Sequence, residues 1–310
     1  MAEKIVVTGG AGFIGSNLIE ALLKKGDYEI TVFDNFSLGY MKNLEAVKDK
    51  IKIVKGDICN YEELEKALNG AKYVFHMAAL SYVGESIRKP VEYNKTNIDG
   101  TLNVLMAAHK NNVQRVLFPS TCIVYGETKA NPIAETEPMN PNTPYGLTKQ
   151  AGEFYCKFFT EVHGLDTICL RIFNAYGPRM QNRVLSIFAN LILENKQPIV
   201  SGDGKQSRDF VFVEDIVNGF LKAMDAEKKH AGKSFNIGTG KGIDLNQLIE
   251  KINDYLGTKI EGKHSKIATG EIDVILADTR VSEKELGFKS NFSFEEGLAK
   301  TLDWIKENKK

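Results

Sequence analysis

Short apolar runs alternate with longer segments of helical periodicity over the first 175 residues. The runs that we expect to form strands are KIVVTG, EITVFD, IKIVKGD, KYVFHMA, RVLFPS and DTICLRIF. The segments that carry apolar residues at helix spacing are FIGSNLIEALLKKG, YEELEKALNG, NIDGTLNVLMAAHKNN and YGLTKQAGEFYCKFFTEVHG. Strands that are almost continuously apolar and alternate with helices predict an α/β fold, in which a doubly wound parallel sheet is covered on both faces.

Beyond residue 175 the alternation loosens and the segments become shorter. The elements that we expect there are a helix over 184–194, a strand over 209–213, a helix from 214, short strands in SFNIG and IDVILAD, and helices near 245 and 294. No linker rich in proline or serine separates the two halves. We therefore predict a first domain over 1–175 and an interleaved, smaller α/β lobe over 176–310. The pattern leaves open whether the strand at 209–213 returns to the main sheet.

The charge balance and the cysteines exclude some classes of partner. The 310 residues include 40 basic and 40 acidic side chains, which gives no overall electrostatic footprint for nucleic acid or an anionic membrane. Four widely spaced cysteines, with no paired histidines nearby, favour neither a zinc site nor a disulfide framework. The N-terminus enters a strand at once, and no segment approaches the roughly 20 apolar residues that span a bilayer. We therefore expect a cytoplasmic protein without a bound metal.

The stretch VVTGGAGFIG places Gly9, Gly12 and Gly15 directly after a strand and at the start of a helix. Glycines in that position allow a tight turn, and they let backbone N–H groups approach a diphosphate at the positive end of the helix. Asp34 ends the next strand, about twenty residues on, where a carboxylate accepts hydrogen bonds from the adenosine ribose and repels a 2′-phosphate. Together these features predict a Rossmann-type domain that binds NAD in preference to NADP.

The stretch TPYGLTKQAGEFY spaces Tyr145 and Lys149 so that they share one face of a helix, about 5–6 Å apart at their Cβ atoms. A free tyrosine has a pKa near ~10, so it acts as a base at neutral pH only where a positive charge favours the phenolate. Lys149 can supply that charge. Taken alone, the pair is more often the start of an amphipathic helix in which the tyrosine packs and the lysine is solvated, so the rest of the chain must decide.

Ten patches, in order along nearly the whole chain, carry a family resemblance. They are TGGAGFIG, VFDNFSLGYMKNLE, GDI, HMAA, VGES, NIDGTLNVL, PSTCIVYGE, PYGLTK, LRIFNAYGPR and GDGKQSRDFVFVEDI. With these patches the chain resembles the extended short-chain dehydrogenase/reductases and, among them, the sugar-nucleotide epimerase/dehydratase family, with the closest likeness to the UDP-glucose 4-epimerases. The resemblance favours catalytic roles for Tyr145 and Lys149.

The resemblance also implies that the lobe over 176–310 is the substrate lobe, which binds the nucleotide sugar, and it implies roles for residues at matching positions. Thr121 falls where the family keeps a serine or threonine beside the catalytic tyrosine. The residues implied to bind the cofactor are Gly9, Gly12, Phe13, Ile14, Gly15, Asp34, Asn35, Asp57, Ile58, Ala78, Ala79, Asn97, Tyr145, Lys149 and Phe173. The residues implied to bind the nucleotide sugar are Thr121, Asn174, Val184, Arg208 and Ile275. As alternatives, Asn97 caps a helix, Arg208 pairs with its neighbour Asp209, and Thr121 merely ends a strand.

The implied reaction is the NAD-dependent 4-epimerisation of a UDP-sugar through a transient 4-keto sugar. In it Tyr145, as the phenolate, takes the proton from the 4-hydroxyl group, and Thr121 hydrogen-bonds the same oxygen. Related dehydratases and decarboxylases carry an acidic residue straight after the Ser or Thr, whereas this sequence continues with Cys122 and Ile123. Both of those reactions are therefore disfavoured, and we expect Cys122 to be a buried thiol rather than a nucleophile.

The segment ATGEIDVILAD departs from the family pattern. Ala268 stands where we expect an arginine that clamps the diphosphate, and Glu271 replaces an aspartate. The basic residues that are candidates to compensate are Lys263, Lys266 and Arg280. This departure leaves the identity of the nucleotide open. Ile275, intermediate in size between the aromatic and small residues of relatives, favours a pocket that tolerates an N-acetyl group.

Other functions and the assembly remain open at this point. The rivals are an epimerase or reductase of another nucleotide sugar and a non-catalytic NAD-binding subunit that kept only the fold. Apolar stripes on the helices starting near 97 and 145 fit either core packing or a dimeric helix bundle. Their residues are Ile98, Leu102 and Leu105 on the first helix and Leu147, Ala151, Phe154, Phe158 and Val162 on the second. The resemblance implies a homodimer with C2 symmetry.

Overall fold

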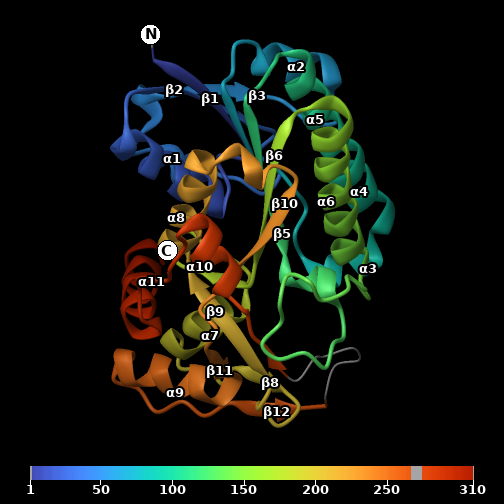
Figure 1. Ribbon diagram of the computed structural model, residues 1–310. Coiled ribbons are helices and arrows are strands. Elements are labelled where there is room, and N and C mark those ends of the chain that lie inside the picture. The colour runs from blue at the N-terminus through green and yellow to red at the C-terminus, as the bar shows by residue number, and fades with distance from the viewer. Residues whose placement is uncertain (1, 267–273, 310) are drawn as a thin grey trace.

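The computed structural model of the protein describes residues 2–266 and 274–309. Its centre is a sheet of seven parallel strands in the order β10-β6-β5-β4-β1-β2-β3 (Figure 1). The strands are β1 (Glu3–Thr8), β2 (Tyr28–Asp34), β3 (Lys52–Lys55), β4 (Tyr73–His76), β5 (Arg115–Thr121), β6 (Asp166–Ile172) and β10 (Lys233–Ile237). The predicted doubly wound sheet is confirmed, and the strand order reverses between β1 and β4, where such sheets bind ligands.

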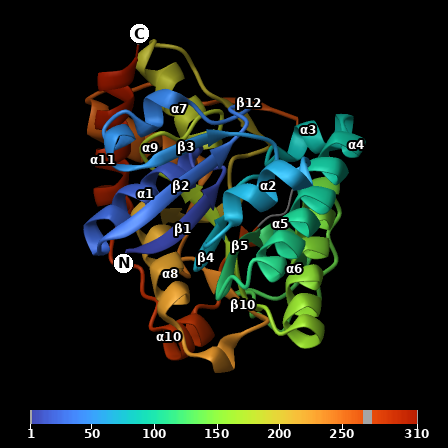
Figure 2. The same cartoon turned by 90° about the horizontal axis from the view of Figure 1, so that it is seen from above.

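Helices cover both faces of this sheet (Figure 2). One face carries α2 (Tyr61–Leu68), α5 (Gly100–Lys110) and α6 (Pro144–His163), and the other carries α1 (Phe13–Lys25), α8 (Val213–Asp225) and α10 (Arg280–Leu286). Ile5 and Val7 pack against α1 and α8, whereas Val6 packs on the opposite face. Because successive side chains of a strand point to opposite faces, a strand buried on both sides must be apolar at nearly every position.

Two short helices between β4 and α5 were not apparent from the sequence pattern. They are α3 (Val83–Arg88) and α4 (Pro90–Asn94), and a π-helical turn over Lys95–Asp99 joins α4 to α5. Each is too short to show a full apolar period, so its sequence reads as a loop.

Helix α6 begins and ends on local sequence signals. The Thr143 hydroxyl accepts a hydrogen bond from the Gly146 nitrogen at 3.2 Å, with Pro144 in the first turn. Gly164 ends the helix with φ +69°. The start of α6 therefore places Tyr145 in the first turn of a helix that packs on β5 and β6.

The smaller lobe is built around β9 (Ser207–Phe212), below the main sheet in Figure 1. Strand β9 pairs with β7 (Asn174–Tyr176), β11 (Gly242–Asp244) and β13 (Val274–Ile275), while β8 (Ile199–Ser201) pairs with β12 (Lys263–Ser265). The helices that pack on this lobe are α7 (Val184–Leu193), α9 (Leu245–Leu256) and α11 (Phe294–Asn308).

The strand that returns to the main sheet is β10, not the strand at 209–213. Helix α8 follows β9, packs beside α1 on the main sheet, and so delivers the chain to the free edge of β6. The domain boundary expected between residues 175 and 176 stays a prediction. In the part of the chain that the structure describes, none of the helices has the length and apolar character needed to cross a bilayer.

Candidate active site

The glycine turn after β1 brings backbone segments closer together than side chains would allow. Gly9 has φ +66°, and a Cβ atom there would lie 2.5 Å from the Ala78 nitrogen after β4. A Cβ atom on Gly15 would lie 2.5 Å from the Gly9 oxygen, and Gly12 precedes α1 without a capping side chain. The positive end of α1 therefore opens onto the cavity that the glycines line, as the binding of a diphosphate requires.

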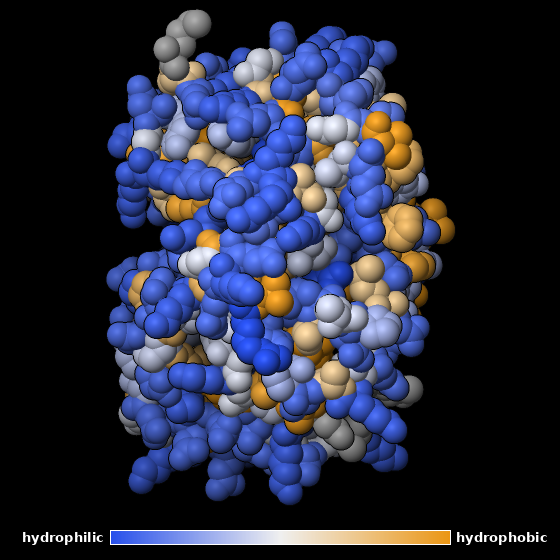
Figure 3. All heavy atoms as spheres, in the orientation of Figure 1, coloured by the Kyte–Doolittle hydropathy of each residue, from blue (hydrophilic) through white to orange (hydrophobic). Residues whose placement is uncertain are grey.

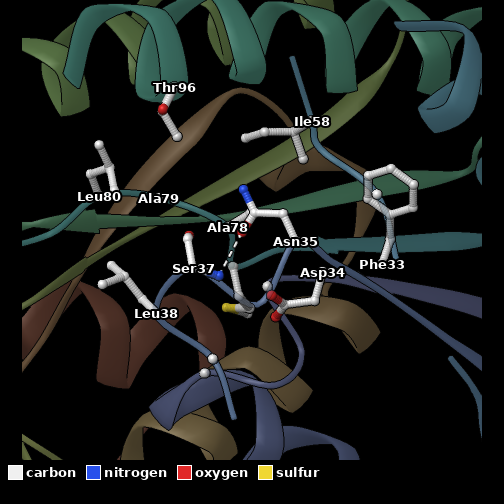
Figure 4. A pocket seen from close by; sticks show the side chains of 15 residues that line it. Phe33, Asp34, Asn35, Ser37, Leu38, Ile58, Ala78, Ala79, Leu80 and Thr96 are labelled. Atoms are coloured by element: carbon white, nitrogen blue, oxygen red, sulfur yellow. Dashed lines mark hydrogen bonds between the residues drawn. The ribbon is translucent and has the colours of Figure 1, made fainter. Parts of the chain in front are cut away.

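A small cavity of about 80 Å³ lies beyond the glycine turn, between the ends of β2 and β4 (Figure 4). Asn35 and Ile58 line it, together with Ala78 and Ala79. The Asn35 amide nitrogen donates to the Asp57 carboxylate at 3.0 Å, so Asp57 lies directly behind this lining. Five residues implied to bind the cofactor are thus gathered at one place.

Asp34 is buried at the end of β2, where it fastens the glycine turn. Its Oδ2 accepts a hydrogen bond from the Ala11 nitrogen at 2.9 Å, and its Oδ1 accepts one from the Phe36 nitrogen at 2.8 Å. Burial raises the pKa of Asp34, and the two backbone bonds act in the opposite direction. Each carboxylate oxygen keeps a further lone pair, so Asp34 fits a ribose hydroxyl as well as the backbone.

Asn97 lies behind the cavity wall rather than in it. Its side chain accepts from the Leu80 nitrogen at 2.8 Å and donates to the Leu80 oxygen at 2.9 Å and to the Thr148 hydroxyl at 3.0 Å. Asn97 therefore fixes the segment after β4 against α6. The helix-cap alternative does not describe it, and its predicted contact with the cofactor stays a prediction.

A larger cavity, of about 480 Å³, joins the glycine turn to the carboxyl ends of β5 and β6. The predicted site residues that line it are Gly9, Gly12, Phe13, Ile14, Gly15, Ala79, Thr121, Tyr145, Lys149, Phe173, Asn174 and Val184. Residues implied to bind cofactor and residues implied to bind substrate thus share one space. The lining also contains Arg179 and Arg183, for which the sequence patterns gave no role.

Tyr145 from α6 and Thr121 from the end of β5 come together in the lining of this cavity. Both side chains are buried. Burial is the main influence on the pKa of Tyr145 and raises it, while the charge of Arg183 and a hydrogen bond with Thr121 act in the opposite direction. A phenolate at Tyr145 therefore depends on positive charge at the site.

Lys149 lies one turn further along α6 and is almost fully buried. Its ammonium donates to the Pro119 oxygen at 2.8 Å and stands 4.6 Å from the centre of the Phe118 ring. Burial lowers the pKa of Lys149 to about 8. The spacing predicted Lys149 as the cation beside the tyrosine. In this structure Lys149 is held at a backbone carbonyl, and Arg183 is the cation that acts on the pKa of Tyr145.

Arg183 precedes α7 and reaches the segment after β4. Its Nη2 donates to the backbone oxygen and to the hydroxyl of Ser81, both at 2.9 Å, and the guanidinium stands 4.7 Å from the centre of the Tyr82 ring. The only hint in the sequence was its position directly before Val184. Two nearby donors, Asn174 Nδ2 and Arg179 Nη1, are buried without a hydrogen-bond partner among the described residues.

Two predicted substrate residues lie just outside the cavity lining. Ile275 on β13 is buried in a cluster with Phe173 and Cys122, and it pairs in register with Arg208 on β9. Burial also raises the pKa of the Cys122 thiol to about 12, as expected for an inert cysteine.

The departure from the family pattern falls in an undescribed segment. Ala268 and Glu271 lie outside the described residues. Arg280, one of the candidates to compensate, is held by the carboxylate of Asp278, with its Nε 2.9 Å from Oδ1. Lys263 and Lys266 are exposed.

Comparisons with known proteins extend the likeness over the whole chain. Residues 5–238 match the NAD dependent epimerase/dehydratase family. A UDP-glucose 4-epimerase from Thermotoga maritima, solved with UDP-glucose, is 35% identical with a TM-score of 0.94, and the match covers 99% of this chain and 100% of that one. A UDP-N-acetylglucosamine 4-epimerase from Methanobrevibacter ruminantium, solved with UDP-N-acetylmuramic acid, is 37% identical with a TM-score of 0.93, and the match covers 99% of each chain.

The likeness also reaches enzymes with other reactions. A UDP-N-acetyl-alpha-D-glucosaminuronate decarboxylase from Bacillus cytotoxicus is 32% identical, over 99% of both chains. Overall similarity therefore does not choose among reactions.

Proposed function

Because this chain belongs to the NAD dependent epimerase/dehydratase family, we propose that it inverts C4 of a UDP-sugar, interconverting UDP-glucose and UDP-galactose and accepting their N-acetyl forms. The observation that carries the proposal is the composition of the cavity at the end of β5. Thr121, Tyr145 and Lys149 line it, and the residues that follow Thr121 there are Cys122 and Ile123. Neither of these can supply the acid that removal of water or of a carboxylate requires.

NAD is the cofactor of this family, and the residues present fit it. The positive φ of Gly9 and the open end of α1 suit a diphosphate, and Asp34 suits an unphosphorylated ribose. When bound, NAD supplies the reversible oxidation of C4 and is unchanged after a full cycle. Loss of the proton from the 4-hydroxyl group is the task left to the protein.

Tyr145, as the phenolate, accepts that proton, and Thr121 donates a hydrogen bond to the same oxygen. Burial opposes the phenolate, so it forms near neutral pH only with the help of positive charge. Arg183 supplies part of that charge, and we assign the same role to Lys149, one helical turn along α6. Return of the proton to the 4-oxygen, when C4 is reduced in the opposite configuration, completes the inversion. The keto sugar must turn between the two steps, which requires a firm hold on the nucleotide and a loose one on the sugar.

The charge of the cavity supports a nucleotide diphosphate as the part of the substrate that the protein binds firmly. Among the described residues, the cavity lining carries Lys149, Arg179 and Arg183 and no carboxylate; Glu20, outside the lining, pairs with Arg179. The unpartnered Asn174 Nδ2 and Arg179 Nη1 supply two further donors, and a buried donor without a partner gains most from an anionic acceptor. We assign Asn174 and Arg208 to the diphosphate and uridine side, with Val184 near the base.

Proton NMR of the purified protein mixed with UDP-galactose or with UDP-N-acetylgalactosamine, without and then with added NAD, tests the proposal. We expect the C4 epimer of both sugars to appear. Bound NAD without any change in either sugar would contradict it, and the site would then belong to another nucleotide or to a non-catalytic role.

We also propose a cytoplasmic homodimer. The outer face of α6 exposes Leu147 (52%), Phe154 (71%), Phe158 (44%) and Val162 (61%) at heptad-like spacing. Hydrophobic side chains gather on the right-hand side of Figure 3, where α6 runs in Figure 1. Leu105 of the expected stripe on α5 is instead buried in the core. Light scattering should give about twice the chain mass of 34.5 kDa for the protein and the chain mass itself for Phe158→Glu. A monomeric unaltered protein would contradict the assembly.

A further inference from the structure

A row of polar side chains crosses β5, β6 and β10 one residue before the level of Thr121. In the sheet register, Arg171 on β6 lies between Ser120 on β5 and Asn236 on β10. Residues in register on adjacent parallel strands point to the same face of a sheet. Thr121 is the next residue on β5, so this row adjoins the proposed site along the strands.

Glu153 lies on α6, which packs on this face of the sheet, and bonds to the row; its side chain is buried, with 5% exposed. Its Oε2 accepts from Arg171 Nη2 at 2.8 Å and from the Ser234 hydroxyl at 2.7 Å, and its Oε1 accepts from Arg171 Nε at 3.0 Å and from the Ser120 hydroxyl. Both carboxylate oxygens are therefore fully used. A buried charge held in this way has one permitted position.

Arg171 also donates hydrogen bonds to groups other than Glu153. Its Nη1 donates to the Tyr125 hydroxyl at 2.9 Å and to the Glu135 backbone oxygen at 3.0 Å. The Tyr125 hydroxyl in turn donates to Asn236 Oδ1 at 2.7 Å. The network thus extends to Tyr125, at the end of the short helical turn that follows Thr121.

The same network fixes α6 against β5. Tyr145, Lys149 and Glu153 are spaced by four residues and share the face of α6 that meets the sheet. Lys149 is bonded to the Pro119 oxygen, and Glu153 is bonded to the Ser120 hydroxyl. Two successive residues of β5 are therefore each held by α6 directly before Thr121. Movement of Glu153 along the strand would change the separation of Thr121 and Tyr145.

A stabilising role alone does not explain this arrangement. A buried ion pair is often no more stabilising than apolar residues of the same volume. What the charges supply here is a defined position, because the pair is bonded to α6 and to Ser120 of β5, the two elements that carry Tyr145 and Thr121. The charge of Glu153 also acts on the site, since it raises the pKa of Lys149 against the lowering effect of burial.

We propose that Glu153 is a positioning residue for catalysis: with Arg171 and Ser120 it sets the register of α6 on β5, and so the separation of Tyr145 from Thr121. This inference rests on the proposed function. It goes beyond that function because Glu153 touches neither cavity.

Glu153→Gln tests the inference, since it keeps the shape of the side chain and removes its charge. We expect kcat to fall by about tenfold or more while KM and the affinity for NAD change by less than about twofold. The alkaline limb of the kcat profile should move to lower pH, because the pKa of Lys149 loses the support of the carboxylate. Ser120→Ala, which leaves the ion pair in place, should lower kcat by a smaller factor.

The chain offers a matched control in a second buried ion pair, which joins β6 to β5 at their amino ends. Arg115 Nη2 and Asp166 Oδ2 are 2.6 Å apart at the opposite ends of β5 and β6. Asp166→Asn should lower stability and leave both kcat per folded molecule and the pH profile unchanged. Equal effects of Asp166→Asn and Glu153→Gln on kcat, or none from Glu153→Gln, would overturn the inference.

A readout without sugar separates this inference from the proposed function. The phenolate absorbance of Tyr145 can be followed with NAD bound, as the difference between the protein and its Tyr145→Phe variant. Glu153→Gln should move that titration to higher pH, because a displaced Thr121 no longer stabilises the phenolate. An unmoved titration overturns the inference even in a protein that converts no UDP-sugar, and a moved one supports it there.

Discussion

A buried ion pair lies at each end of strand β6, Asp166 with Arg115 of β5 at the amino end and Arg171 with Glu153 of α6 at the carboxyl end, and the two pairs differ in how completely they are bonded. At the carboxyl end, every polar atom of Glu153 and Arg171 has a partner. At the amino end, Arg115 Nε and Asp166 Oδ1 are buried without one among the described residues. Complete bonding therefore occurs at the end where a catalytic group must be placed to a fraction of an ångström.

The two pairs also lead to different parts of the molecule. Arg115 Nη1 donates to the Ala223 and Met224 oxygens at 2.8 Å and 2.9 Å, so it satisfies the end of α8. Arg171 leads through Glu153 and Tyr125 to the segments around Thr121. One buried ion pair thus bonds the last carbonyl groups of α8, and the other connects the elements that carry the proposed site residues.

The largest effect is expected at the carboxyl end, from Tyr145→Phe. Loss of a positioned acid or base typically costs roughly 10²- to 10⁴-fold in rate, so kcat should fall by that factor. NAD binding, measured by fluorescence titration, should change little because the phenyl ring keeps the packing. Loss of NAD binding or of the fold instead would mean that Tyr145 is a structural residue.

At the amino end, Arg115→Met should act on stability alone. It leaves Asp166 buried without its partner, and breaking a buried pair in this way costs about 3–5 kcal/mol of unfolding free energy. Urea denaturation measures this loss. Activity per folded molecule should equal that of the unaltered protein, and a lower kcat in the folded fraction would remove the contrast between the two ends.

Ile275 approaches the carboxyl end from the smaller lobe and should control selectivity. Ile275→Tyr narrows the space beside Phe173, so the rate with UDP-N-acetylgalactosamine relative to UDP-galactose should fall by about tenfold. Ile275→Val, which narrows nothing, serves as the control and should keep the ratio. Equal losses for both sugars in Ile275→Tyr would place the residue away from the acetamide.

The smallest effect concerns the pH dependence of stability. The pKa of Lys149 is lowered to about 8 from the ordinary 10.5, so between these values the unfolded chain binds more protons than the folded one. The free energy of unfolding of the unaltered protein, compared with that of Lys149→Met, should therefore rise by about 1–3 kcal/mol across that window. The cost of burying the ammonium is fully present below about pH 8. Arg115→Met, compared in the same way, should show a flat difference because an arginine stays charged throughout.

The main sheet could be predicted, and so could several residues that line the larger cavity, because their signals are local. Each strand and helix has its own period, Gly9 and Asp34 stand at fixed places beside their strands, and Tyr145 and Lys149 are related by one helical turn. The position of Lys149 at a carbonyl could not be predicted, since it depends on how α6 is seated on β5.

Contacts between distant segments account for what the sequence did not give. Arg183 reaches Ser81, 102 residues away, and no pattern near Arg183 indicates that partner. The unpartnered Asn174 Nδ2 likewise follows from the packing of several segments. The position of β10 depends on where the end of α8 brings the chain, and β9 was an equally apolar candidate for the same edge of the sheet.

Strand β10 has a consequence for the chain as a polymer. It is the outermost strand beside β6, which is buried along its whole length. A fragment that stopped at residue 175 would leave the N–H and C=O groups of β6 as an open template on which another chain can add a strand. The first half should therefore aggregate when it is synthesised alone, and the growing chain remains exposed to this hazard until residues 233–237 have been made.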